Sequence, residues 1–446
     1  VVLRQRLAAR VEAATPAGRE RAIDGLRALA IAGVIIGHWL VMALTVGADG
    51  SLHGTSPLLR LPALAPLSWV LQMLGLFFLV GGYASARSLA RARSRGMRDG
   101  TWLRGRLLRL ARPVLAVILA LGAALPLLGL AGVPTGTLRT TVVLVAQPLW
   151  FIGIYAVITA LTPAVLALER RLGALSALPP LLIVAAVDLL RYGPWRHAMP
   201  GWLGLLNILP GWSFAYLLGI AWAHGRIGRR GATLLALGGG ALALLLVLRL
   251  GYPASMVGVP GAGRVNSHPP SLLVLALAAL QCGLAIRLRE RIERILRRPG
   301  LWTAVALGNL HAMTIFCWHQ VALMTLTGAT LALVPSGLPG LHDTPDGLGW
   351  VAHRVEWFPA QLALLAGYVV LAHRFESPWR AANRRHDQDQ GAGVSVPSPK
   401  SVGGPWLPGT GSWPLSRRPP DGRRPRSSPG FSRRCPSCHP PRSRPA

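Results

Sequence analysis

Long apolar runs recur along the chain, and joints rich in arginine separate them. An apolar run of about 20 residues is long enough to cross the hydrocarbon core of a bilayer, which is about 30 Å thick. Of the 446 residues, 52% are hydrophobic and only 14% are charged. We therefore predict an all-α polytopic membrane protein with about ten transmembrane helices.

The predicted spans divide the chain into three parts. Residues 1–20 form an N-terminal segment, residues 21–380 the transmembrane domain, and residues 381–446 a basic tail rich in Pro, Arg and Ser. The tail has no hydrophobic periodicity, so we expect it to be disordered. Because the chain begins at Val1, we expect an unconventional start codon or a shortened end. The predicted spans cover residues 26–46, 67–85, 113–131, 141–164, 174–190, 203–223, 232–250, 271–286, 302–326 and 358–372.

The distribution of arginine predicts the topology. Joints at 87–112, 169–171, 226–230 and 287–298 are arginine-rich, whereas the intervening joints carry scattered single charges. The positive-inside rule then places both termini in the cytoplasm, and we expect a multi-pass protein of the plasma membrane. A net charge of +31 would suggest a nucleic-acid partner in a soluble protein. Here the topology explains the charge, so no nucleic acid is expected.

The first span carries one ionisable side chain inside its apolar run. His38 lies near the middle of residues 26–46, where a histidine costs free energy unless it has a partner or a function. Arg27 precedes it by about three helical turns, so both lie on one helix face, roughly 16 Å apart along the axis. Asp24 is three residues before Arg27 and can pair with it. The alternative is that Arg27 only anchors the topology and His38 bonds to a neighbouring helix.

Two later segments carry further ionisable residues. His311 and His319 fall in the ninth predicted span, where a hydrogen-bonding role in the core is favoured over catalysis. Glu356 lies beside His353 and Arg354 at the expected outer end of the last span. These residues can meet an incoming ligand or cap a helix, and the second role is favoured.

The most basic joint contains Arg106, Arg109 and Arg112 at three-residue spacing, which places them along one side of a helix. Guanidinium groups match phosphate geometry, so this side can bind a phosphorylated ligand. The alternative is that the arginines serve topology and anionic lipid alone. Because the sequence contains no spacing typical of a structural zinc site, we expect no metal.

Five motifs in order are similar to those of the acyltransferase-3 family of integral membrane acyltransferases. In D-G-L-R-A-L-A, ten residues separate the arginine, Arg27, from His38. The other four motifs are LGLFFLVGGYASARSL, LRGRLLRLARP, PLWFIGIYAVI and NLHAMTIFCWHQ. The resemblance covers about residues 20–380. Gly81 stands where the family usually has serine, and Phe316-Cys317 where it usually has Tyr-Leu, which leaves the choice of acceptor open.

The resemblance implies an enzyme that transfers an acyl group, often acetyl, from acyl-CoA to a hydroxyl acceptor, frequently a sugar. His38 is then the catalytic base, and Arg27, beside Asp24, supports donor binding. A neutral imidazole can take the acceptor's proton as its oxygen attacks the thioester. The expected donor-binding residues are Arg106, Arg109, Arg112 and Tyr83. The expected acceptor-binding residues are His319, Glu356 and Trp150.

Two other classes of protein compete with the enzyme. In a transporter, His38 would relay protons and the arginines would only set the topology, but internal repeats typical of transporters are not evident. A membrane scaffold without chemistry would not need an ionisable residue inside a span. The acceptor stays open among a glycan, a lipid-linked sugar and a secondary metabolite. The acyl chain length, the oligomeric state and the role of the tail stay open too.

Overall fold

Apolar helices dominate the computed structural model, which describes residues 2–259 and 263–376. Of the described residues, 76% are helical, and the all-α prediction is confirmed. The predicted tail, residues 381–446, lies outside the described residues, as does Val1. The helices are α1 Val2–Ala13, α2 Arg21–Val41, α3 Leu67–Leu71, α4 Leu74–Ser94, α5 Asp99–Leu130, α6 Thr135–Ala146, α7 Leu149–Ala160, α8 Thr162–Leu172, α9 Leu178–Tyr192, α10 Ile208–Ala223, α11 Arg229–Arg249, α12 Leu272–Ile295, α13 Pro299–Leu310, α14 Ala312–Leu333, α15 Leu348–Glu356 and α16 Phe358–Glu376.

The number of membrane spans agrees with the prediction. Within the described residues, nine helical segments are long and apolar enough to cross a bilayer. The count reaches ten if α15 and α16, bent by 40° at a short break, form one span together. The side of the membrane on which the termini lie stays a prediction from charge.

The first span ends earlier than predicted. Helix α2 stops at Val41, and Ala43–Val46 forms strand β1, which pairs antiparallel with β2, Leu52–Thr55. The connecting turn explains the change, because Gly50 has a positive φ of 73° and the Asp49 carboxylate accepts hydrogen bonds from the amide and hydroxyl of Ser51. His38 therefore lies in the last turn of α2 and not at the middle of a longer helix.

The ninth predicted span is broken. Helix α13 ends at Leu310 and α14 begins at Ala312, with His311 between them. The Asn309 side chain donates to the backbone carbonyl oxygens of Asp24, at 2.8 Å, and Val305, at 3.0 Å. The Asn309 side chain thus joins the last turn of α13 to the first turn of α2. Helix α14 is a separate helix that begins after this break.

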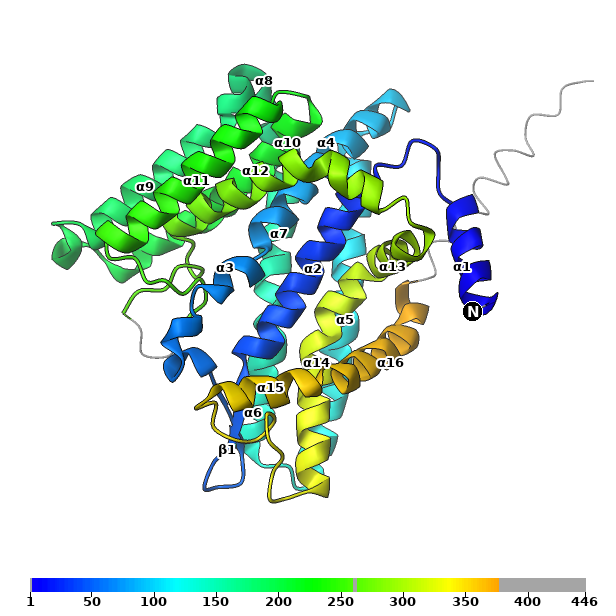
Figure 1. Ribbon diagram of the computed structural model, residues 1–446, viewed down its shortest axis with the longest axis vertical. Coiled ribbons are helices and arrows are strands. Elements are labelled where there is room, and N and C mark those ends of the chain that lie inside the picture. Colours follow the sequence, from blue (N-terminus) through cyan, green and yellow to red (C-terminus); the bar gives the residue numbers. More distant parts are fainter. Residues whose placement is uncertain (1, 260–262, 377–446) are drawn as a thin grey trace, which may run out of the picture. The chain divides into compact units, whose positions relative to one another are not determined.

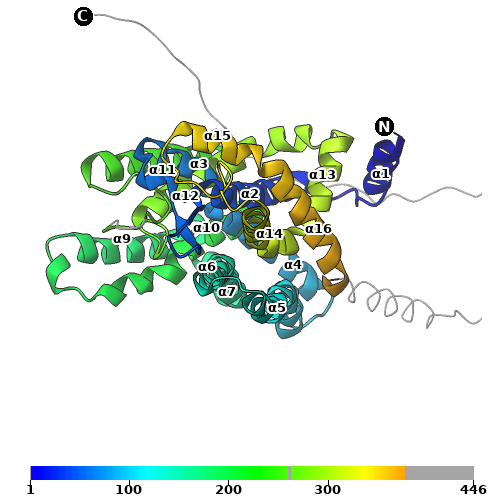
Figure 2. The same ribbon diagram turned by 90° about the horizontal axis from the view of Figure 1, so that it is seen from below.

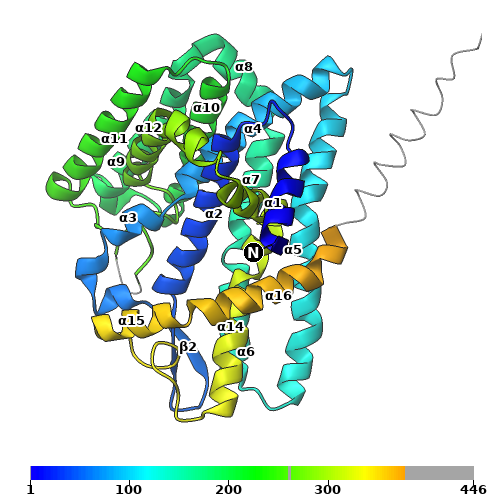
Figure 3. The same cartoon turned by 45° about the vertical axis from the view of Figure 1, so that its right-hand side comes forward.

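Helix α2 lies between several other helices, as Figure 1 shows. It contacts α4, α12, α13 and α14. Helices α6, α7 and α5 lie in this order on one side of α14 when the molecule is seen from below (Figure 2). Helices α15 and α16 run across α2, α14 and α5, and α16 packs against α14 where the two cross (Figure 3). The two ends of α2 therefore meet different partners: α12 and α13 at its start, β1 and α15 at its end.

The main core packs around α4, α10 and α12. Phe78 of α4 stacks on Trp212 of α10 with ring centroids 5.3 Å apart, and both side chains are buried. Gly82 of α4 faces the Tyr216 carbonyl of α10, and Gly219 of α10 faces the Leu79 carbonyl of α4. A Cβ at either glycine would overlap backbone atoms, so small residues allow this close helix contact.

Candidate active site

His38 pairs with a second histidine across the helix contact. Its Nδ1 atom lies 3.0 Å from Nε2 of His319 on α14, and the ring centroids are 5.1 Å apart. His319 is fully buried, and its Nδ1 lies 2.6 Å from the carbonyl oxygen of Phe316. The sequence predicted that His319 faces the interior. It did not predict the direct pairing with His38, because nothing local links residues 281 positions apart.

A buried arginine fixes the end of α2 that carries His38. Arg354 of α15 donates to the carbonyl oxygens of Trp39, at 2.7 Å, of Gly340, at 3.0 Å, and of Met42, at 2.7 Å. The last carbonyls of a helix have no partner within it, so a cation is favourable there. The Trp39 indole in turn donates to the backbone carbonyl of His319, at 3.1 Å. The end of α2 is thus fastened to α14 and α15.

His38 lines a cavity of about 830 Å³, a volume within the range of small-molecule sites. Its walls come from α2, strand β2 of the hairpin, α3, α6, the start of α7, the loop before α12, and α14. Among the described residues, the lining contains no aspartate or glutamate, but it contains hydroxyl, amide and imidazole groups. The polar and aromatic lining residues are His38, His53, Thr55, Ser56, Ser68, Gln72, Arg139, Thr140, Gln147, Trp150, Phe151, Ser267, His268, Phe316 and Gln320.

Trp150, predicted to bind the acceptor, lies in this cavity wall, and that role stays a prediction. Its ring meets the ring of His268 edge-on, with centroids 4.3 Å apart. The surrounding protein lowers the pKa of His268 below its ordinary value, because the enclosed site disfavours the charged ring. His268 was missed from the sequence, since it lies in a Gly/Pro-rich loop without a recognisable motif.

The other two residues predicted for acceptor binding are not part of this lining. His319 lies behind His38 and is buried. Glu356 is exposed and pairs with His353, with Nδ1 and Oε2 3.2 Å apart. Its neighbour Arg354, which the sequence grouped with it at a helix end, is the residue that contacts α2. Gln320, missed from the sequence, lines the cavity with its Nε2 atom 3.4 Å from Nδ1 of His38.

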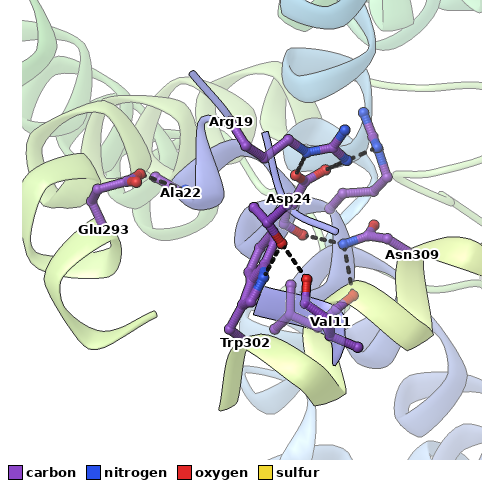
Figure 4. Close-up of polar contacts among 10 residues, drawn as sticks. Val11, Arg19, Ala22, Asp24, Glu293, Trp302 and Asn309 are labelled. Atoms are coloured by element: carbon purple, nitrogen blue, oxygen red, sulfur yellow. Dashed lines mark hydrogen bonds and ion pairs between the residues drawn. The ribbon is translucent and has the colours of Figure 1, made fainter. Parts of the chain in front are cut away.

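The predicted pair of Asp24 and Arg27 is present at the other end of α2. Asp24 is buried, and its Oδ1 lies 3.4 Å from a guanidinium nitrogen of Arg27. Arg19 makes the closer contact, with two hydrogen bonds of 2.5 and 3.0 Å to the same carboxylate. Figure 4 shows Arg19 facing Asp24, with Asn309 directed at the Asp24 backbone. Asp24 therefore orients two arginines at the start of the helix.

Two of the predicted donor-binding residues, Arg106 and Arg109, interact electrostatically with Arg27. Arg109 also interacts with Arg106, and both Arg27 and Arg109 interact with Tyr155. One nitrogen of Arg106 donates to Ala84 O, at 3.1 Å, and to Ser88 Oγ, at 2.6 Å. Arg109 is exposed and Arg112 is half-buried. None of the four arginines belongs to the lining of the His38 cavity.

Tyr83, predicted to bind the donor, has a partner within the protein. Its hydroxyl group lies 2.8 Å from Oε1 of Glu20, and its ring packs on Trp222 with centroids 4.8 Å apart. Its role in donor binding stays a prediction.

The fold and this site define a multi-pass membrane protein with a basic cluster at one end of a central helix and a histidine pair beside a cavity at the other. The family model of the acyltransferase-3 acyltransferase domain matches residues 20–372, the main part of the chain. The chain belongs to this family, and it is a membrane acyltransferase. No curated protein and no solved structure matches the chain. The enzyme is thereby favoured over the transporter and the scaffold.

Proposed function

We propose that the protein transfers an acyl group, acetyl in the first instance, from acyl-CoA to a hydroxyl group of an acceptor, with His38 as the general base. The observation that carries the proposal is the position of His38, which lines a cavity of about 830 Å³ while its Nδ1 contacts His319. The Nε2 atom is then the nitrogen available to a ligand.

The chemistry needs only one base and one thioester. His38 Nε2 takes the proton of the acceptor hydroxyl while the oxygen attacks the thioester carbonyl carbon. The tetrahedral intermediate collapses, the carbon–sulfur bond breaks, and the CoA sulfur leaves with the proton that His38 returns. Proton transfer by a positioned side chain typically contributes 10²–10⁴-fold to such a rate.

The basic cluster at the start of α2 suits the phosphates of CoA. Arg27, Arg106 and Arg109 interact electrostatically with one another, and guanidinium groups bind phosphate oxygens in forked pairs. We infer that the donor's nucleotide end binds there, on the cytoplasmic side given by the charge-based topology. The acyl-carrying arm then has to extend along α2, by roughly 16 Å, to reach His38.

The cavity at the other end of α2 suits the acceptor. Its hydroxyl and amide side chains can bond to a hydroxylated ligand, and Trp150 and Phe151 offer ring faces and edges to a sugar or another ring. The walls include the β1–β2 hairpin, which the topology places on the outer side of the plasma membrane. A glycan, a lipid-linked sugar or a secondary metabolite would enter from there.

The test is release of free CoA by the purified protein from acetyl-CoA, with methyl glycosides and aryl alcohols offered as acceptors. Wild-type protein should release CoA and form the acetyl ester, whereas His38→Ala should lose at least about 10²-fold in rate. His197→Ala, at an exposed histidine, is the matched control and should keep the wild-type rate. A His38→Ala variant with normal turnover contradicts the proposal.

Arg106→Ala combined with Arg109→Ala should raise the KM for acetyl-CoA, and an unchanged KM would remove the donor assignment.

A further inference from the structure

The positions of the protons in the pair of His38 and His319 follow from the contact of His319 with the Phe316 carbonyl. A backbone carbonyl can only accept a hydrogen bond, so Nδ1 of His319, 2.6 Å from the Phe316 oxygen, carries a hydrogen. A neutral imidazole has one N–H, which leaves Nε2 of His319 as an acceptor. A doubly protonated His319 is disfavoured, because the ring is fully buried and its hydrogen-bond contacts within the described residues are to His38 and the Phe316 carbonyl, not to a carboxylate.

The same reasoning extends to His38. Its Nδ1 lies 3.0 Å from the bare Nε2 of His319, so His38 Nδ1 must be the donor. The single N–H of neutral His38 is then on Nδ1, and the lone pair is on Nε2. Three groups in a row, from the Phe316 carbonyl through His319 to His38, thus fix which nitrogen of His38 is basic.

We propose that His319 is a positioning residue that holds His38 in the Nδ1–H tautomer and so leaves Nε2 to take the acceptor's proton. This inference rests on the proposed function, in which His38 is the base. When Nε2 gains the proton, the Nδ1–H···Nε2 bond to His319 becomes charge-assisted and therefore stronger. The proton stays on His38 until the leaving sulfur takes it, and none moves to His319.

Hydrogen bonds around His38 and His319 hold the two helices in the position that brings the rings together. The Trp39 indole donates to the His319 carbonyl, at 3.1 Å, and Arg354 binds the Trp39 carbonyl, at 2.7 Å. As placed, Nε2 of Gln320 lies 3.4 Å from His38 Nδ1, and two N–H groups cannot bond to each other. The Nδ1–H tautomer of His38 therefore requires the opposite orientation of the Gln320 amide, with Oε1 toward His38.

Two variants of His319 separate positioning from packing. His319→Gln keeps an acceptor oxygen near His38 Nδ1, whereas His319→Leu fills the space without an acceptor. We expect His319→Leu to lower kcat by about 10²–10⁴-fold, as wrong tautomers do in other histidine enzymes. His319→Gln should recover at least about tenfold of that loss, and the KM for acetyl-CoA should stay unchanged in both. His342→Leu, at a second buried histidine, is the control and should keep kcat.

The tautomer itself is measured by ¹⁵N NMR of the histidine-labelled protein in detergent, with His38→Gln and His319→Gln to assign the signals. The account predicts Nδ1–H and bare Nε2 for both histidines. His38 protonated on Nε2, or wild-type kcat in His319→Leu, would overturn the inference, and so would a loss in His319→Leu that His319→Gln does not relieve. The NMR result does not depend on turnover. Absence of acyl transfer in the wild type would instead refute the proposed function.

Discussion

At the scale of single residues, the site depends on which atoms are left without a protein partner. His38 uses one ring nitrogen for His319 and lines a cavity whose described lining residues include no carboxylate. A carboxylate nearby would compete for the acceptor's hydroxyl proton and repel the developing negative oxygen. Imidazole, amide and hydroxyl groups in the lining avoid both effects while still allowing hydrogen bonds to a ligand.

His268, in the cavity wall, makes the stability of the folded protein depend on pH. Its folded-state pKa is lowered by the surrounding protein, so the unfolded chain binds more protons at acid pH. His268 therefore does not change the free energy of unfolding above the ordinary pKa near 6.5, and it lowers that free energy as the pH falls below this value.

We expect the apparent melting temperature of the purified protein to drop between about pH 7.5 and about pH 5, and His268→Gln to remove part of that drop. His197→Gln, on an exposed turn, should leave the drop as it is. An identical pH dependence in wild type and His268→Gln would show that His268 is not the group responsible.

At the scale of elements, the end of α2 depends on residues from α15. Arg354 satisfies carbonyl oxygens that the helix cannot satisfy itself. Hydrogen bonds to charged groups are worth about 1.5–3 kcal/mol each, and loss of the arginine leaves buried carbonyls unpaired.

Arg354→Met should therefore destabilise the protein by about 3 kcal/mol or more and lower kcat as the end of α2 loosens. The apparent melting temperature and the rate of CoA release measure the two effects. Glu356→Gln, two residues away and exposed, is the control and should change neither. If Arg354→Met has the melting temperature of the wild type, the contact of Arg354 with the carbonyls of α2 does not stabilise the end of that helix.

The apolar runs were sufficient to predict the spans, since a bilayer requires length and hydrophobicity that the sequence displays directly. The early end of α2 was missed because Val46 is as apolar as the helix before it, and the Asp49–Ser51 turn decides where the strand begins. The pair of Asp24 and Arg27 was predictable from helical spacing. Arg19, Gln320, His268 and the contact of His38 with His319 were not, because they depend on tertiary structure.

At the scale of the whole molecule, the two ends of α2 lie beside segments of different charge. The end of α2 with Arg27 lies beside the joint at 287–298, where Arg21 donates to the Leu296 carbonyl at 3.2 Å. The end with His38 lies beside the hairpin, which carries few charges. Donor and acceptor would thus approach from opposite sides of the membrane, and the acyl group would pass between them.

This topology is tested by labelling single cysteines with a membrane-impermeant maleimide, after the four native cysteines are replaced by serine. Asp49→Cys and Arg95→Cys both lie at exposed positions, on the hairpin and at the end of α4. The first should be labelled on intact cells and the second only after the cells are opened. The reverse pattern would invert the membrane orientation and with it the two approach routes.

The central claim, that the His38 imidazole takes the acceptor's proton, is tested most directly by chemical rescue. His38→Gly removes the ring and leaves its space open to the cavity, and added imidazole can then act as the missing base. If His38 is the base, His38→Gly alone should show almost no acyl transfer, and activity should recover saturably as imidazole is added. Transfer at the wild-type rate without imidazole, or no recovery in a folded variant that still binds acetyl-CoA, would contradict this claim.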